Sequence, residues 1–373
     1  MPLRERLERW TKAPAWTVTA CVALFYLLFT VVALGLHDWD PLWFAWIGER
    51  FAELDPAGRQ GYDGQFVHYI ATLGKAAIPH LDSPAYRLQR ILLPLVARGL
   101  HLMTGLPIAW AVPLINFVAI VLLTEGLATW LAARGRSPWY ALTISLYVGM
   151  LMAYSRNLTE PLALCLAARG VFLWDRGHYP GSALLLALAF LTKEITAIFA
   201  AGLVCSTLAR RDPKAALWPA LALLPLLLWE GYLTAAFGRL PFRSGPSLEP
   251  VLVSGILPHL TSDPGRLSAF LLAGLPALLL LPISLAVLRT RGFRSPAPWL
   301  TAFNALFVLL LPLNVYDHIM HAGRNAGGLL LALVFLLPLL NRHLRRLAWA
   351  GAVLPTLVWL IPILRWAPWL SRI

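Results

Sequence analysis

The stretch 62-YDGQFVHYIA-71 gathers an acid, an amide, a histidine and two tyrosines between long apolar segments. Asp63 precedes Gly64, which leaves room for a substrate or for a tight turn that aims the carboxylate. A carboxylate held this way suits a general base or a ligand contact, and the alternative is a helix N-cap that binds the free amides of the first turn. Hydrogen bonds to a ligand are offered by four neighbours: Tyr62, Gln65, His68 and Tyr69.

A second acidic motif begins the same polar region. Asp38 and Asp40 have the D-x-D spacing that lets two carboxylates share a divalent cation such as Mg²⁺ or Mn²⁺. The alternative is a pair of solvated acids, with Asp40 as the N-cap of a helix that starts at Pro41. The surrounding aromatic residues are expected to form an interfacial belt: Trp39, Trp43, Phe44 and Trp46.

Basic residues follow in 82-DSPAYRLQRILLPL-95. Arg87 and Arg90 are three apart and therefore share a helix face. Guanidinium groups bind phosphate oxygens through two parallel hydrogen bonds. The alternative, favoured by the sequence alone, is that both side chains extend to ordinary lipid headgroups.

Charged residues inside or beside apolar segments are costly and are usually paired or functional. Arg156 and Glu160 are four apart and are expected to pair along a helix, while Lys193 and Glu194 lie where two short apolar runs meet. A last group indicates anion binding or proton transfer better than zinc binding: Asp317, His318, His321 and Arg324. Each of these groups also fits a structural ion pair.

The composition indicates an integral membrane protein, because 59% of the 373 residues are hydrophobic and only 13% are charged. We predict an all-α, single polytopic membrane domain over residues 1–373. The eleven expected spans are 16–36, 108–132, 138–154, 159–174, 180–192, 195–209, 215–236, 267–288, 297–314, 327–341 and 347–364. The apolar run 91–106 is left out, because Arg98 and His101 lie near its middle. It is expected to be a helix in the membrane interface.

The charge distribution predicts the orientation. With these spans and a cytoplasmic N-terminus, the cytoplasmic segments carry 16 Lys and Arg against 4 Asp and Glu, and the opposite side carries 14 against 13. The long loop 37–107, with its interfacial helices, and the loop 237–266 are then extracytoplasmic. The net charge of +13 faces anionic membrane lipid, and no basic groove with aromatic residues indicates nucleic acid binding.

Several motifs resemble those of a known family. The runs 47-IGERFAELDPAGRQGYDGQFVHYIA-71 and 82-DSPAYRLQRILLPLVA-97, with R-N-L-T-E-P at 156–161 and L-T-K-E at 191–194, resemble bacterial multi-pass proteins linked to cell-surface glycopolymer formation. The overall plan is similar to the GT-C superfamily of glycosyltransferases, which includes the GPI mannosyltransferases. The local motifs span about a quarter of the chain, and the superfamily likeness rests mainly on the plan.

The resemblance implies an inverting glycosyltransferase of a bacterial inner membrane that uses a polyprenyl-phosphate-linked sugar. It would act at the extracytoplasmic face on a glycan or lipid acceptor. The base expected in the first outer loop is Asp63, with Asp40 as second choice. Two other classes stay open: a glycolipid or anion transporter, and a non-catalytic subunit of a glycopolymer assembly system.

Overall fold

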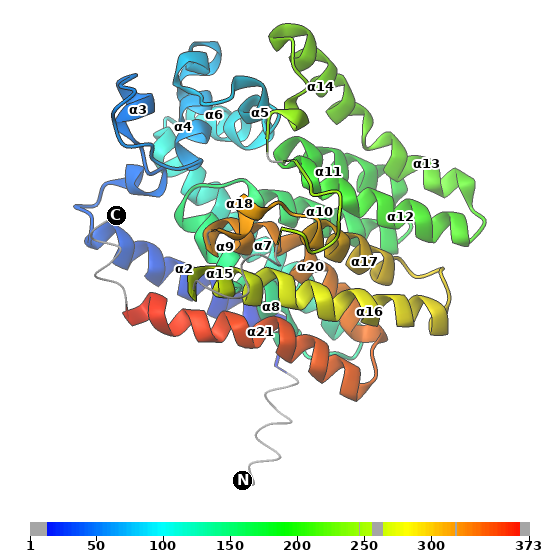
Figure 1. Ribbon diagram of the computed structural model, residues 1–373. Helices are drawn as coiled ribbons and strands as arrows, with labels where there is room; N and C mark the ends of the chain where they lie inside the picture. The colour runs from blue at the N-terminus through cyan, green and yellow to red at the C-terminus, as the bar shows by residue number, and fades with distance from the viewer. Residues whose placement is uncertain (1–12, 246, 256–263, 318, 366–373) are drawn as a thin grey trace.

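The computed structural model describes residues 13–245, 247–255, 264–317 and 319–365, and every regular element within them is a helix (Figure 1). Five helical segments are long and apolar enough to cross a membrane: Ala15–Gly35, Ile108–Ala132, Pro213–Phe237, Leu267–Arg291 and Ile319–Leu339. The prediction of an all-α membrane protein is confirmed at this level. Most of the other expected spans coincide with shorter or broken helices, and 347–364 lies within a 24-residue helix that is not among the five, so the number eleven stays a prediction.

The first third of the chain places one long helix before a group of short ones. Its elements are α2 (Ala15–Gly35), η1 (Pro41–Phe44), α3 (Glu49–Ala52), α4 (Gly64–Leu73), η2 (Gly74–His80), α5 (Pro84–Leu88), α6 (Leu92–Thr104) and α7 (Ile108–Ala132). The predicted cap of η1 is confirmed, because the Asp40 carboxylate accepts a 2.9 Å hydrogen bond from the Leu42 amide and Pro41 follows it.

The middle of the chain forms the helices behind that group. They are η3 (Pro138–Ala141), α8 (Leu142–Ser145), α9 (Val148–Ser155), α10 (Glu160–Asp175), α11 (Tyr179–Thr192), η4 (Glu194–Thr196), α12 (Ala197–Ala209), α13 (Pro213–Leu221), α14 (Leu224–Phe237) and η5 (Pro241–Arg243). Proline stands at the first or second position of α10, α11, α13 and α14, where its missing N–H has no partner to lose.

The last part closes the bundle. Its elements are α15 (Pro264–Ala269), the π-helical turn η7 (Phe270–Gly274), α16 (Leu275–Arg291), α17 (Pro296–Leu309), α18 (Leu313–Tyr316), α19 (Ile319–Asn325), α20 (Gly327–Leu336), η8 (Leu337–Leu339) and α21 (Arg342–Arg365). Residues 329–337 are all buried, so α20 lies at the centre of the bundle, where it packs against α17 and α10. A helix that is apolar on every side requires such surroundings.

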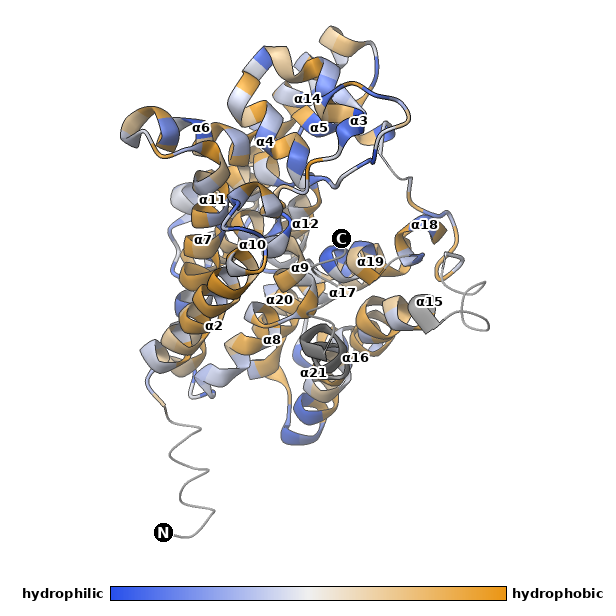
Figure 2. Cartoon of the chain, turned by 90° about the vertical axis from the view of Figure 1, so that its left-hand side faces the viewer, coloured by the Kyte–Doolittle hydropathy of each residue, from blue (hydrophilic) through white to orange (hydrophobic). Residues whose placement is uncertain are grey.

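The outer helices expose apolar side chains on a large scale. On α2, Val18, Val22 and Tyr26 recur every fourth residue and are fully buried, whereas Leu27 and Leu28 are more than half exposed. An apolar outer face of this kind is stable against lipid chains and unstable against water. Figure 2 shows orange helices around most of the bundle, with bluer segments among α3, α4 and α5 at its upper end.

The predicted interfacial helix exists as α6. Leu93 and Ala97 are buried in a small cluster with α4 and α7, while Leu102 and Met103 are 73% and 79% exposed. Figure 2 shows α6 projecting sideways from the upper part of the bundle. This shape agrees with a helix that presents an apolar face to its surroundings, and its place in the membrane interface stays a prediction.

Candidate functional site

A large cavity collects residues from the predicted loops 37–107 and 237–266 and from the segments around Lys193 and Arg324. Its volume is about 1070 Å³. Residues from 60–66 and 86–90 form one side, and residues from 193–195, 242–245, 247–248, 307–315 and 321–325 supply the rest. The polar residues along its walls are Gln60, Tyr62, Asp63, Gln65, Tyr86, Arg87, Gln89, Arg90, Lys193, Glu194, Arg243, Ser247, Asn314, His321, Arg324 and Asn325. Segments that are far apart in sequence therefore build one polar chamber.

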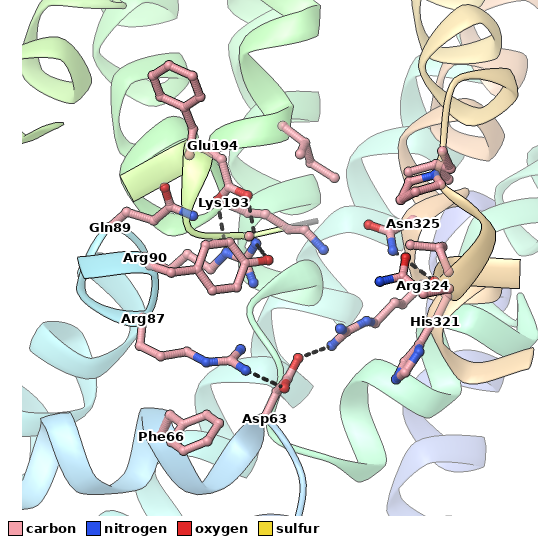
Figure 3. A pocket seen from close by; sticks show the side chains of 18 of the residues that line it. Asp63, Phe66, Arg87, Gln89, Arg90, Lys193, Glu194, His321, Arg324 and Asn325 are labelled. Atoms are coloured by element: carbon pink, nitrogen blue, oxygen red, sulfur yellow. Dashed lines mark hydrogen bonds and ion pairs between the residues drawn. The ribbon is translucent and has the colours of Figure 1, made fainter. Parts of the chain in front are cut away.

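Asp63 lies between two arginines that approach from opposite walls (Figure 3). One carboxylate oxygen is 3.0 Å from Nη2 of Arg87, and the other accepts a 2.6 Å hydrogen bond from Nη1 of Arg324. Asp63 occupies the N-cap position of α4, but its side chain makes no capping hydrogen bond. The N-cap alternative is therefore wrong for the carboxylate, which faces the cavity.

Gly64 holds Asp63 in this place through a close backbone contact. A Cβ at position 64 would lie 2.0 Å from the carbonyl oxygen of Arg156. Only glycine allows α4 to begin directly against the 155–158 turn, where Asn157 adopts a left-handed conformation with φ of 51°. The glycine of the Asp63–Gly64 pair thus positions the carboxylate, because it allows the two backbones to pack closely.

The electrostatic surroundings keep Asp63 ionised. Burial alone would raise the pKa of its carboxyl group, but Arg324 and Arg87 outweigh that effect and hold the pKa well below its usual range. Burial raises the pKa of the neighbouring Tyr62 to about 12, so its hydroxyl stays protonated. The Tyr62 ring stacks between Trp46 and His321, with ring centroids 5.8 and 6.0 Å away.

Arg87 and Arg90 are buried, with side chains only 12% and 14% exposed. Arg87 also donates to both carboxylate oxygens of Asp82, each at 2.7 Å. Arg90 donates to both oxygens of Glu194, at 2.9 and 2.6 Å. The expectation that these arginines extend to ordinary headgroups is wrong, because both are held inside the protein by carboxylates.

Glu160 pairs with a distant lysine. Its carboxylate accepts a 2.5 Å hydrogen bond from Nζ of Lys193, and Nε of Arg324 lies 4.0 Å from the same carboxylate. The expected pairing of Glu160 with Arg156 is wrong. α9 ends at Ser155 and α10 begins at Glu160, so the two residues do not share a helix. Asp63, Arg324, Glu160 and Lys193 form a continuous chain of opposite charges.

Arg156 is instead enclosed by tryptophan rings. Its guanidinium carbon lies 4.7 Å from the ring centroid of Trp43 and 4.6 Å from that of Trp46, and the side chain forms no ion pair among the described residues. Phe44 is fully buried, whereas Trp39 is 59% exposed. The predicted aromatic belt is therefore wrong for these rings except Trp39, because Phe44 packs against Tyr154 of α9 and the rings of Trp43 and Trp46 lie against Arg156.

Other predicted site residues lie outside the cavity or are already bonded. The Gln65 amide accepts from Gly48 N–H at 3.1 Å and donates to the Gln60 carbonyl at 2.8 Å, which ties the loop together. His68 and Tyr69 do not line the cavity. His318 lies outside the described residues.

The proposed metal pair also lies outside the cavity. Asp40 uses its carboxylate to cap η1, and no third acidic, histidine or cysteine ligand joins Asp38 and Asp40. Within the ranges that the structure describes, no group of three or more such side chains is arranged to hold a metal ion. The divalent cation stays a prediction, and no chemical step is assigned to it.

The structure adds residues that sequence reasoning did not select. Gln89 stands between Arg87 and Arg90 in the sequence, and Phe242 and Arg243 enter from the 237–266 loop. The run 86-YRLQR-90 places Gln89 beside two arginines but does not show that its amide lacks a partner. Nothing in the loop sequence indicated which of its residues face a ligand.

The cavity walls carry an excess of positive charge. The lining residues include five cations, at Arg87, Arg90, Lys193, Arg243 and Arg324, against the carboxylates of Asp63 and Glu194. Such a chamber attracts an anion, and low polarity around it strengthens each interaction. Comparison of the chain with protein families, curated proteins and solved structures finds no match. The geometry of this cavity is therefore the basis for a functional assignment.

Proposed function

We propose that this chain is a membrane glycosyltransferase that moves a sugar from a polyprenyl-phosphate-linked donor to a glycan or lipid acceptor. The observation that carries the proposal is Asp63, a buried carboxylate held between Arg87 and Arg324 in a cationic cavity. A carboxylate beside several cations is the arrangement that removal of a hydroxyl proton and departure of a phosphate both require. The motifs that resemble glycopolymer proteins point to the same reaction.

The proposed step is a single displacement. The Asp63 carboxylate takes the proton of an acceptor hydroxyl while that oxygen forms a bond to the anomeric carbon. The bond from the anomeric carbon to the phosphate oxygen breaks, and its electron pair leaves with the polyprenyl phosphate. The arginines stabilise the negative charge that grows on the phosphate. One displacement inverts the anomeric configuration.

The ion pairs of Asp63 determine the order in which donor binding and proton transfer occur. A carboxylate held by two guanidiniums is a weak base, since its pKa is depressed. A donor phosphate competes with Asp63 for Arg87 and Arg324, and each contact that it takes raises the basicity of Asp63. Donor binding would therefore precede proton transfer, and the acceptor would react only after the donor is in place.

The chemistry of the donor determines where the reaction takes place. A polyprenyl chain belongs in hydrocarbon and a sugar phosphate belongs in water, so the two meet at a membrane surface. The exposed apolar helices and the cavity provide these two environments in one chain. In the proposed topology the cavity faces the extracytoplasmic side of a bacterial inner membrane.

Transport is a second candidate, and one observation favours it. A small cavity beyond Arg324, lined by Glu160, Lys193 and Asn304, continues the polar chain inward. Its volume is only about 10 Å³, the lower limit for one water molecule, so it does not form a path wide enough for a glycolipid head group in this conformation.

The deciding experiment uses the purified protein in proteoliposomes with radiolabelled polyprenyl-phosphate sugars and a panel of glycan and lipid acceptors. A glycosyltransferase consumes the donor and releases polyprenyl phosphate, whereas a transporter moves the label across the bilayer without cleaving it. Asp63→Asn serves as the control for protein-dependent turnover. Translocation with intact donor would overturn the proposal.

A further inference from the structure

Gln89 is a buried amide without a partner in the segment 86–90, whose other polar side chains are bonded. The segment 86–90 faces the cavity with Tyr86, Arg87, Gln89 and Arg90. Arg87 binds Asp63 and Asp82, and Arg90 binds Glu194 and the Tyr86 hydroxyl. The Gln89 side chain is 0% exposed, and within the described part of the chain neither its nitrogen nor its oxygen has a hydrogen-bond partner.

Such an amide is unusual, because most buried polar groups are bonded and an unpaired one costs about 1–3 kcal/mol. The segment is fixed from behind, since the Trp229 indole donates a 2.9 Å hydrogen bond to the Leu88 carbonyl. Gln89 also ends α5, where its own N–H bonds to the Ala85 carbonyl. The backbone holds the side chain at the wall, and Figure 3 shows it directed to the same side as Arg87 and Arg90.

The surroundings of Gln89 match a sugar ring. Its amide offers one donor group and one acceptor, the pattern that two adjacent sugar hydroxyls complement. η5 packs against α5, and Gly245 lies against the Tyr86 ring, so this part of the 237–266 loop borders the same wall. Phe242 on η5 lines the cavity and is 57% exposed, which leaves an apolar ring face for the C–H side of a sugar.

We propose that Gln89 is a specificity-determining residue that binds two adjacent hydroxyls of the sugar carried by the lipid phosphate. The proposal rests on the proposed function, because it takes the donor phosphate to lie at Arg87 and Arg324. A sugar is bonded directly to that phosphate, and Gln89 is two residues from Arg87 on the same wall. A site built to hydrogen-bond a hydroxyl rejects ligands that lack it, because its amide then stays unpaired.

The test measures binding without turnover. Affinities are measured by native mass spectrometry in nanodiscs for undecaprenyl phosphate alone and for the same lipid bearing a hexose, a pentose or an N-acetylhexosamine. The wild type is expected to bind at least one sugar-bearing lipid roughly tenfold more tightly than the bare lipid. In Gln89→Leu and Gln89→Met this preference is lost, while affinity for the bare lipid is kept. Free methyl glycosides show whether the same contact serves an acceptor sugar, and Gln89-dependent binding of these alone would overturn the assignment to the donor.

A matched control comes from the other buried cavity glutamine. Gln65 is also 0% exposed, but both ends of its amide are bonded to the loop. Gln65→Leu should lower the unfolding temperature, whereas Gln89→Leu should keep or raise it, since it removes an unpaired group. Equal loss of stability in the two variants would make Gln89 a structural residue and overturn the inference.

The outcomes separate this inference from the proposed function. If the wild type binds neither the bare nor the sugar-bearing lipid, the donor class is wrong and both proposals fail. If it binds them equally, or if both Gln89 variants keep the sugar preference, the role of Gln89 alone is wrong.

Discussion

Two pairs of opposite charges in this protein differ in how far they are exposed. At the ends of α7 and α10, Arg134 pairs with Asp175 and lies 4.0 Å from the Trp130 ring centroid, and the two charged side chains are 34% and 38% exposed. In the cavity, Glu160 and Lys193 are 5% and 4% exposed. Exposed pairs contribute about 0–1 kcal/mol, whereas buried ones must offset desolvation of several kcal/mol per ion.

The difference indicates which pair serves a ligand. The exposed Arg134–Asp175 pair needs no ligand to explain it, because water or lipid headgroups solvate both charges at little cost. Burying charged side chains costs free energy, so a cluster of buried charges indicates a site where a ligand binds. The following variants test this contrast.

The largest effect is expected from Asp63→Asn. It should reduce sugar transfer by about 10²–10⁴-fold, because the amide cannot accept the proton. It should also bind undecaprenyl phosphate more tightly than the wild type does, because Arg87 and Arg324 lose their internal competitor. Transfer rates and lipid affinities measure the two effects, and Asp175→Asn is the matched control with both unchanged. Full transfer by Asp63→Asn would remove Asp63 as the base.

Breaking the buried pair should mainly affect stability. Lys193→Met leaves the Glu160 carboxylate buried without its lysine and should lower the free energy of unfolding by about 3–5 kcal/mol. The double variant Lys193→Met with Glu160→Leu should recover much of that loss. Thermal unfolding in detergent provides the measurement, and a double variant no more stable than Lys193→Met would show that the loss does not come from an unpaired Glu160 carboxylate.

Gly64→Ala is expected to have an intermediate effect. The new methyl group would lie 2.0 Å from the Arg156 carbonyl oxygen, so α4 must shift and carry Asp63 with it. We expect a loss of roughly 1–3 kcal/mol in stability and a larger relative loss of transfer. Gly99, whose added Cβ would meet no atom within 4 Å, is the control position. A variant with normal transfer would mean that the contact does not position the carboxylate.

The smallest effect is expected at the exposed pair. Arg134→Met should change the free energy of unfolding by about 0–1 kcal/mol and leave transfer unchanged. A loss of stability as large as that of Lys193→Met would show that the exposed pair matters as much as the buried one.

The sequence was sufficient to predict the helical membrane class, because hydropathy fixes which segments are apolar. The sequence was not sufficient to predict which charged side chains form ion pairs. The Arg156–Glu160 spacing indicates one helix, yet a left-handed Asn157 ends α9 and sends Glu160 to Lys193. Gln89 could not be selected either, since an unpaired amide is defined by what surrounds it in space.

The crossing of α9 and α19 has a mechanical consequence for the cavity. A Cβ at Gly149 would lie 2.4 Å from the carbonyl oxygen of Gly323, so the two backbones touch with no side chain between them. α19 cannot slide along such a contact, and Arg324 is therefore anchored one residue beyond it. The opposite side is fixed in the same way at Gly64, where the backbone of α4 meets the Arg156 carbonyl oxygen. The two groups that hold Asp63 in place, its own backbone and Arg324, are therefore both set by direct contacts between backbones that only glycine permits.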